Sequence, residues 1–101
     1  MSNEHNQFDT YKKLLLEIIQ KHIPGCSIYL FGSRARKTNR SGADIDLAFD
    51  CGRIVDFDIL LKLRSEIDDT NIPLTVDLVD LHNASDTLKN VIKQEGIIWK
   101  A

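Results

Sequence analysis

Three short β-type runs alternate with segments of helical periodicity within only 101 residues, and this pattern constrains the fold more than any other feature. Apolar or β-branched residues cluster in the runs 27–32, 44–50 and 74–81. Apolar residues recur at helical spacing over 8–22, over about 55–69, and again after residue 85. Neither a short strand nor an amphipathic helix can bury its apolar face alone, so the helices must pack on a shared sheet. The order helix, strand, strand, helix, strand, helix predicts one α/β domain over residues 1–101.

Turn and capping residues mark where these elements end. Pro24-Gly25 follows the first helix, and a polar stretch over 34–42 reads as a loop. Ser85 or Asn83 can cap the last helix, and Gly96 stands just past its end. The apolar tail 97–99 has two interpretations: it contacts a partner, or it adds a strand and covers the core.

Composition excludes several classes of protein. Thirteen Lys and Arg against fifteen Asp and Glu give a net charge of −2, which argues against wrapping of duplex DNA. No apolar run approaches the roughly 18 residues of a membrane span, and the polar N-terminus lacks a signal-peptide pattern, so no membrane association is expected. Cys26 and Cys51 are too few for a disulfide scaffold and lack zinc-site spacing. We expect them to be small buried or half-buried residues in a reducing cytoplasm.

Three aspartates carry the chemistry that the sequence suggests. Asp44 and Asp46 are two residues apart in a predicted strand, so their side chains share one face, and Asp77 lies in the next predicted strand. If those strands are neighbours, the carboxylates converge, and divalent cations would relieve their repulsion. The alternative is an ordinary solvated sheet face. Asp80, three residues past Asp77, should face the other side and act as a strand-end or capping acid.

A small turn and a basic loop precede these acids. Gly32-Ser33 follows the first apolar strand, and the loop carries Arg34, Arg36 and two further basic residues with no acid among them. Backbone N–H groups and guanidinium groups together can hold a polyphosphate, beside acids that would hold its metal. Each basic residue taken alone is equally consistent with a solvated loop.

Together these motifs resemble the minimal nucleotidyltransferase group of the DNA polymerase beta superfamily. The resemblance rests on Leu30-Phe31-Gly32-Ser33, Asp44-Ile45-Asp46-Leu47-Ala48 and Val76-Asp77-Leu78-Val79-Asp80. It implies an α+β palm, a small mixed sheet with flanking helices, and an enzyme that transfers AMP from ATP. It further implies that Gly32, Ser33, Arg34 and Arg36 hold the nucleotide, while Asp44, Asp46 and Asp77 bind two Mg²⁺ ions. Asp77 would also help to activate the attacking hydroxyl.

The resemblance also suggests a partner. Larger members of the superfamily carry a helical domain, for which 101 residues leave no room. It implies a separate helical protein of the HEPN type, a toxin to which this chain would be the antitoxin, with a protein hydroxyl as the AMP acceptor. The alternative is a non-catalytic nucleotide-binding subunit that neutralises or completes the partner by binding alone. The lack of an aromatic stacking surface and of a broad basic stripe argues against a nucleic-acid acceptor.

Overall fold

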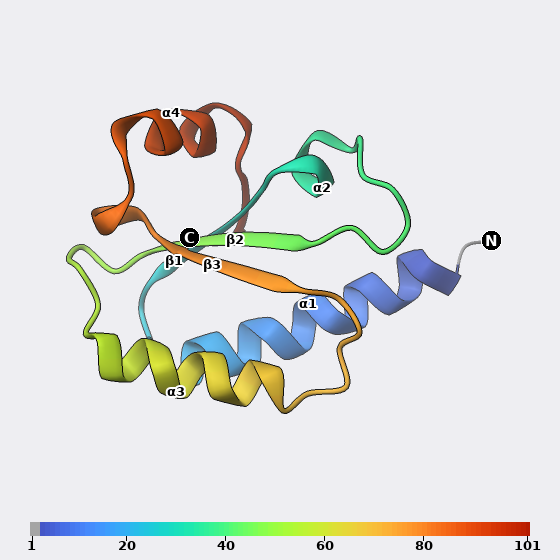
Figure 1. Ribbon diagram of the computed structural model, residues 1–101, viewed down its shortest axis with the longest axis horizontal. Coiled ribbons are helices and arrows are strands. Elements are labelled where there is room, and N and C mark those ends of the chain that lie inside the picture. The colour runs from blue at the N-terminus through green and yellow to red at the C-terminus, as the bar shows by residue number, and fades with distance from the viewer. Residues whose placement is uncertain (1–2) are drawn as a thin grey trace.

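The computed structural model describes residues 3–101, and their side chains from residue 7 onward. The fold is the expected α+β arrangement, with one mixed sheet of strand order β3-β2-β1-β4 and flanking helices (Figure 1). The β2–β3 pair is parallel, whereas β1 is antiparallel to both β2 and β4. In chain order the elements are α1 (Asn3–His22), β1 (Ser27–Phe31), α2 (Ser33–Arg36), β2 (Ile45–Asp50), α3 (Phe57–Asp68), β3 (Val76–Asp80), the 3₁₀ turn η1 (Leu81–Asn83), α4 (Asp86–Glu95) and β4 (Ile97–Lys100).

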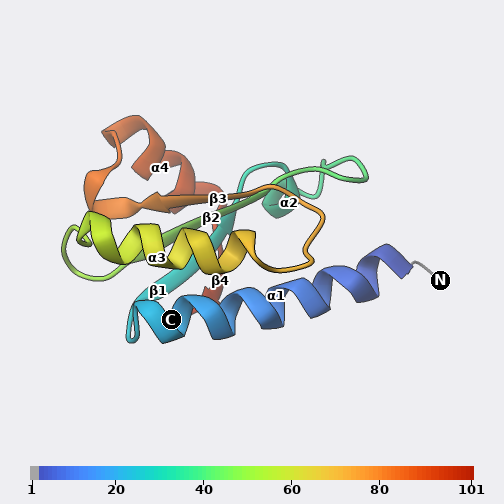
Figure 2. The same ribbon diagram turned by 60° about the horizontal axis from the view of Figure 1, so that its bottom comes forward.

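The helices form two layers on opposite faces of the sheet. Helices α1 and α3 cover one face, and α2 and α4 lie over the other, as both ribbon views show (Figures 1 and 2). Along β2, Ile45, Leu47 and Phe49 are buried in the hydrophobic core. Because neighbouring residues of a strand point to opposite faces, Asp46 and Asp50 point toward the α2 and α4 side. The alternation of acids and apolar residues in β2 therefore separates a polar face from the core.

The structure settles one element that the sequence left open and adds one that the sequence did not predict. The predicted apolar tail is strand β4, which pairs with β1 in the sheet, so it takes the strand-forming alternative. Trp99 packs edge-on against the Phe8 ring of α1, with 6.1 Å between the ring centroids. The predicted 34–42 loop opens with the helical turn α2, which is too short to show a helical period in the sequence. Among residues 3–101, no helix is both long and apolar enough to cross a membrane.

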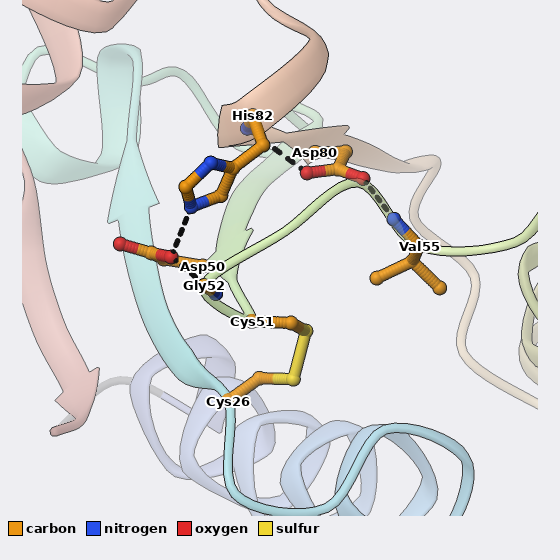
Figure 3. Close-up of polar contacts among 7 residues, drawn as sticks. All are labelled: Cys26, Asp50, Cys51, Gly52, Val55, Asp80 and His82. Atoms are coloured by element: carbon orange, nitrogen blue, oxygen red, sulfur yellow. Dashed lines mark hydrogen bonds and ion pairs between the residues drawn. A yellow bond between two sulfur atoms is a disulfide. The ribbon is translucent and has the colours of Figure 1, made fainter.

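The two cysteines form a disulfide, which the sequence analysis did not expect. Cys26, before β1, is bonded to Cys51, after β2, with 4.3 Å between the Cα atoms (Figure 3). Both are buried or half-buried as expected, and the bond between them is one that the expected reducing environment does not favour. The antiparallel pairing of Ser27 with Asp50 brings the two residues together across 25 positions of sequence. The cysteine count therefore no longer supports a reducing compartment, and the cytoplasmic location stays a prediction.

Candidate active site

The parallel pairing of β2 with β3 brings the predicted carboxylates together. Asp46 and Asp77 are direct register partners, and their carboxyl groups are close enough for Asp77 to raise the pKa of Asp46. Asp44, which precedes β2 and is exposed, lies close enough to add to the negative field at Asp46. The Ile45 N–H donates to the carbonyl of Thr75 over 2.8 Å, which aligns the beginnings of the two strands. The structure thus brings Asp77 beside Asp46, with Asp44 within electrostatic range.

Crowding and burial change the acidity of this group. The pKa of Asp46 is raised, first by burial, then by the hydrogen bond and charge of Asp77 and by the charge of Asp44. Arg36 acts in the opposite direction and lowers the pKa. A cation bound at this point would relieve the repulsion that the carboxylates impose on one another.

The pKa of Asp50, on the same face of β2, is shifted in the opposite direction from that of Asp46. Its pKa is lowered, mainly by the Gly52 N–H and then by His82, whose ring nitrogen Nε2 lies 2.7 Å from the Asp50 carboxylate (Figure 3). Asp80 is buried on the other face, where it accepts hydrogen bonds from the N–H groups of Val55 and His82. Its predicted role as a strand-end capping acid is confirmed. Neither acid belongs to the cluster around Asp46.

The carboxylate cluster suits a hard cation in its donor type. Its oxygens are the ligands that Mg²⁺ prefers, and two of the carboxyls belong to register partners on adjacent strands. Within residues 7–101, however, no three His, Cys, Asp or Glu side chains are arranged as a ready metal centre. The observed geometry therefore offers a pair, Asp46 and Asp77, with Asp44 nearby and exposed.

Gly32 lies directly against Asp46 and has no room for a side chain. Its backbone has φ +76° and ψ −159°, a conformation that is essentially restricted to glycine. A Cβ atom built on Gly32 would lie 2.2 Å from Oδ2 of Asp46. Both the backbone conformation and the approach to the carboxylate therefore require glycine at this position.

The predicted nucleotide-binding residues separate into two groups. Ser33 begins α2 directly after Gly32, and Arg36 at the end of α2 is near enough to Asp46 to lower its pKa. Arg34 has other partners: its guanidinium donates to the Ala43 carbonyl at 2.9 and 3.1 Å. It also lies 4.7 Å from the centre of the Phe8 ring. In this geometry Arg34 holds the loop against α1, and its role toward a nucleotide stays a prediction.

One residue that sequence reasoning missed belongs to this site. Glu95, the last residue of α4, accepts hydrogen bonds from the Gly32 N–H and from Arg36. No motif in the sequence connects these positions, which are 63 and 59 residues apart. Only the pairing of β4 with β1 brings the end of α4 back to the glycine turn.

A separate cavity of about 740 Å³ lies beneath α4. Its lining includes Tyr29 of β1, Asp50, His82 and two lysines of α4, Lys89 and Lys93. None of the predicted site residues lines it. This cavity is therefore not part of the predicted site.

A carboxylate pair on adjacent strands, with a glycine turn against one of its members and basic residues following the turn, fits the chemistry of nucleotidyl transfer. The family model "Polymerase beta, Nucleotidyltransferase" matches residues 13–100, and the chain belongs to this family. The family assignment made from the motifs, the α+β fold class and the nucleotidyltransferase class of enzyme are confirmed.

Relatives within the family include a named transferase and members of solved complexes. The chain is 26% identical over 81 residues to the probable protein adenylyltransferase MntA of Haemophilus influenzae, covering 80% of this chain and 71% of that protein. It is similar to a chain in the structure of a tri-AMPylated Shewanella oneidensis HEPN toxin with MNT antitoxin, at 26% identity and TM-score 0.70, covering 90% and 70% of the two chains. A toxin-antitoxin structure with AMP-PNP matches at 30% identity and TM-score 0.68, covering 87% of this chain and 71% of that chain.

Proposed function

We propose that this protein is an antitoxin that transfers AMP from ATP to a hydroxyl of a HEPN-type helical partner protein. The observation that carries the proposal is the in-register pairing of Asp46 with Asp77, with Gly32 lying directly against Asp46. The printed descriptions of the relatives, a protein adenylyltransferase and an AMPylated HEPN toxin with its MNT antitoxin, support the transferred group and the acceptor class.

Each residue of the site has a defined task in this reaction. Asp44, Asp46 and Asp77 would hold the metal, for which carboxylate oxygens are suitable ligands. Gly32, Ser33 and Arg36 would bind the phosphates through N–H, hydroxyl and guanidinium donors. Mg²⁺, when bound, supplies positive charge at the phosphate oxygens and lowers the pKa of an attacking hydroxyl.

The bond changes follow from the substrate. The acceptor hydroxyl oxygen forms a bond to the α-phosphorus of ATP, and the bond from that phosphorus to the oxygen bridging to the β-phosphorus breaks. Pyrophosphate leaves with the electron pair of the broken bond. Asp77 is exposed at the sheet edge and next to Asp46, so it is the side chain that we assign to take the hydroxyl proton.

Replacing Asp77 with asparagine tests this proposal directly. Asp77→Asn keeps the shape of the side chain but removes a metal ligand and the proton acceptor. We expect transfer of labelled AMP from ATP to the partner protein to fall by at least about 10²-fold. Addition of Mg²⁺ should raise the melting temperature of the unaltered protein more than it raises the melting temperature of the variant.

Asp58→Asn is the matched control. Asp58 is an exposed acid on α3, on the opposite side of the sheet, and its loss changes the net charge equally. The control should keep both the transfer and the Mg²⁺ shift. Undiminished transfer by Asp77→Asn would contradict the assigned role. If that variant neutralises the partner fully without any modified residue by mass spectrometry, the non-catalytic binding subunit is the better description.

A further inference from the structure

The Glu95 carboxylate accepts hydrogen bonds from Gly32 and Arg36, two of the residues that we propose bind the phosphates. Its Oε1 atom accepts from the Gly32 N–H at 3.2 Å and from Arg36 Nη1 at 2.9 Å. Only 23% of its side chain is exposed, so this contact is partly sheltered from water. A single carboxylate oxygen thus accepts hydrogen bonds from both a backbone N–H and a guanidinium N–H.

This arrangement is the one that a phosphate oxygen adopts with the same donors. Carboxylate and phosphate oxygens both accept charge-assisted hydrogen bonds from Arg and from backbone N–H groups. Arg36 is also within electrostatic range of Asp46, so its guanidinium interacts with both Asp46 and Glu95. A nucleotide polyphosphate held by Gly32 and Arg36 beside Asp46 would need the position that Glu95 Oε1 occupies.

The fold does not need this contact to hold the end of α4. The Gly96 N–H donates to the Ile92 carbonyl over 2.8 Å and closes the helix. A Cβ on Gly96 would lie 2.4 Å from that carbonyl oxygen, so the glycine permits the tight turn. Strand β4 then pairs with β1 immediately beyond. Because the backbone on both sides is held independently, the Glu95 side chain can leave its donors without loss of the fold.

We propose that Glu95 is an internal competitor for the polyphosphate. Its carboxylate occupies Gly32 and Arg36 in the nucleotide-free protein, is displaced when a polyphosphate binds, and returns to those donors as pyrophosphate leaves. This inference rests on the proposed function, because it takes the same donors to bind phosphate. The consequence is weaker retention of pyrophosphate, and a binding site that stays charge-neutralised between turnovers.

Removal of the negative charge at Glu95 should strengthen the binding of polyphosphates. Glu95→Gln keeps an oxygen acceptor for the Gly32 N–H and loses the competing charge. Calorimetric titration with pyrophosphate and with ATP, both in the presence of Mg²⁺, should show affinity higher by about five- to tenfold than in the unaltered protein. The gain should decrease with added salt. In the transfer assay, pyrophosphate should inhibit the variant at lower concentration.

Glu17→Gln is the matched control, because Glu17 is an exposed residue on α1 and the change in net charge is the same. Its affinities should equal those of the unaltered protein. Glu95→Ala provides a second variant, and equal melting temperatures of the variants would confirm that each is folded. Weaker binding by both Glu95 variants would mean that Glu95 positions Arg36, and this would overturn the inference. Unchanged binding would overturn it as well.

Failure of the inference can be told apart from failure of the proposed function. If ATP and pyrophosphate bind the unaltered protein and Arg36→Ala weakens them, the site binds phosphate whatever Glu95 does. If neither ligand binds any variant, with or without Mg²⁺, then both the transferase proposal and the competitor are refuted. Tighter binding by Glu95→Gln, with unchanged binding by the control Glu17→Gln, supports the role of Glu95 as a competitor.

Discussion

Replacing Gly32 with alanine separates the cost of a strained backbone from the cost of displacing the Asp46 carboxylate, to which we assign a catalytic role. The φ of +76° and ψ of −159° lie in a region that L-residues avoid. Holding alanine there costs about 1–3 kcal/mol of unfolding free energy. The new Cβ would also lie 2.2 Å from Oδ2 of Asp46, so that carboxylate would have to move by about 1 Å.

The displacement of the Asp46 carboxylate should reduce activity far more than it reduces stability. A misplacement of about 1 Å in a reacting group costs on the order of 10²-fold in rate. Gly32→Ala should therefore lower AMP transfer by about that factor at a temperature where the variant is still fully folded. Urea unfolding measures the first cost, and transfer of labelled AMP measures the second.

Gly25→Ala is the control for the stability cost of placing alanine at a positive φ. Gly25 has a similar φ of +80°, but nothing lies within 4 Å of its built Cβ. It should lose a comparable amount of stability and keep full activity. If Gly32→Ala is destabilised as Gly25→Ala is but transfers AMP at the normal rate, Asp46 does not act where we place it, and the reasoning is refuted.

Two further predictions concern the disulfide and the two aspartates of β2. Cys26→Ser with Cys51→Ser opens a loop of 25 positions and should cost about 3 kcal/mol in urea unfolding without loss of transfer; equal stability of the unaltered protein with and without reductant would contradict the bond. The raised pKa of Asp46 means that the folded state binds its proton more tightly, so stability falls as pH rises from the ordinary value of 3.8 through the folded pKa. Without metal, Asp46→Asn should therefore melt higher than the unaltered protein at neutral pH and equally in acid. Asp50 has a lowered pKa, so its contribution is present above 3.8 and is lost as pH falls through the folded pKa. Asp50→Asn should melt lower at neutral pH, and the same sign for both variants would refute the assignment.

The local parts of this protein were readable from its sequence. Alternation of acids and apolar residues in β2 placed Asp46 on the face opposite the core, and helical spacing located α1, α3 and α4. Ser85 was predicted as a possible cap of the last helix, and it accepts a hydrogen bond from the Leu88 N–H. These features depend on the period of a strand or a helix and on neighbours a few residues away, so they leave a trace in sequence order.

The tertiary structure decided the contacts between distant parts of the chain. The parallel register of β2 with β3 sets Asp77 opposite Asp46, and the pairing of β4 with β1 returns Glu95 to the glycine turn. The disulfide of Cys26 with Cys51 likewise follows from strand pairing and not from cysteine spacing. Periodicity specifies which face of an element is buried but not which element covers it or in what register. The identity of the carboxylates was therefore determined by sequence, and their assembly by the sheet.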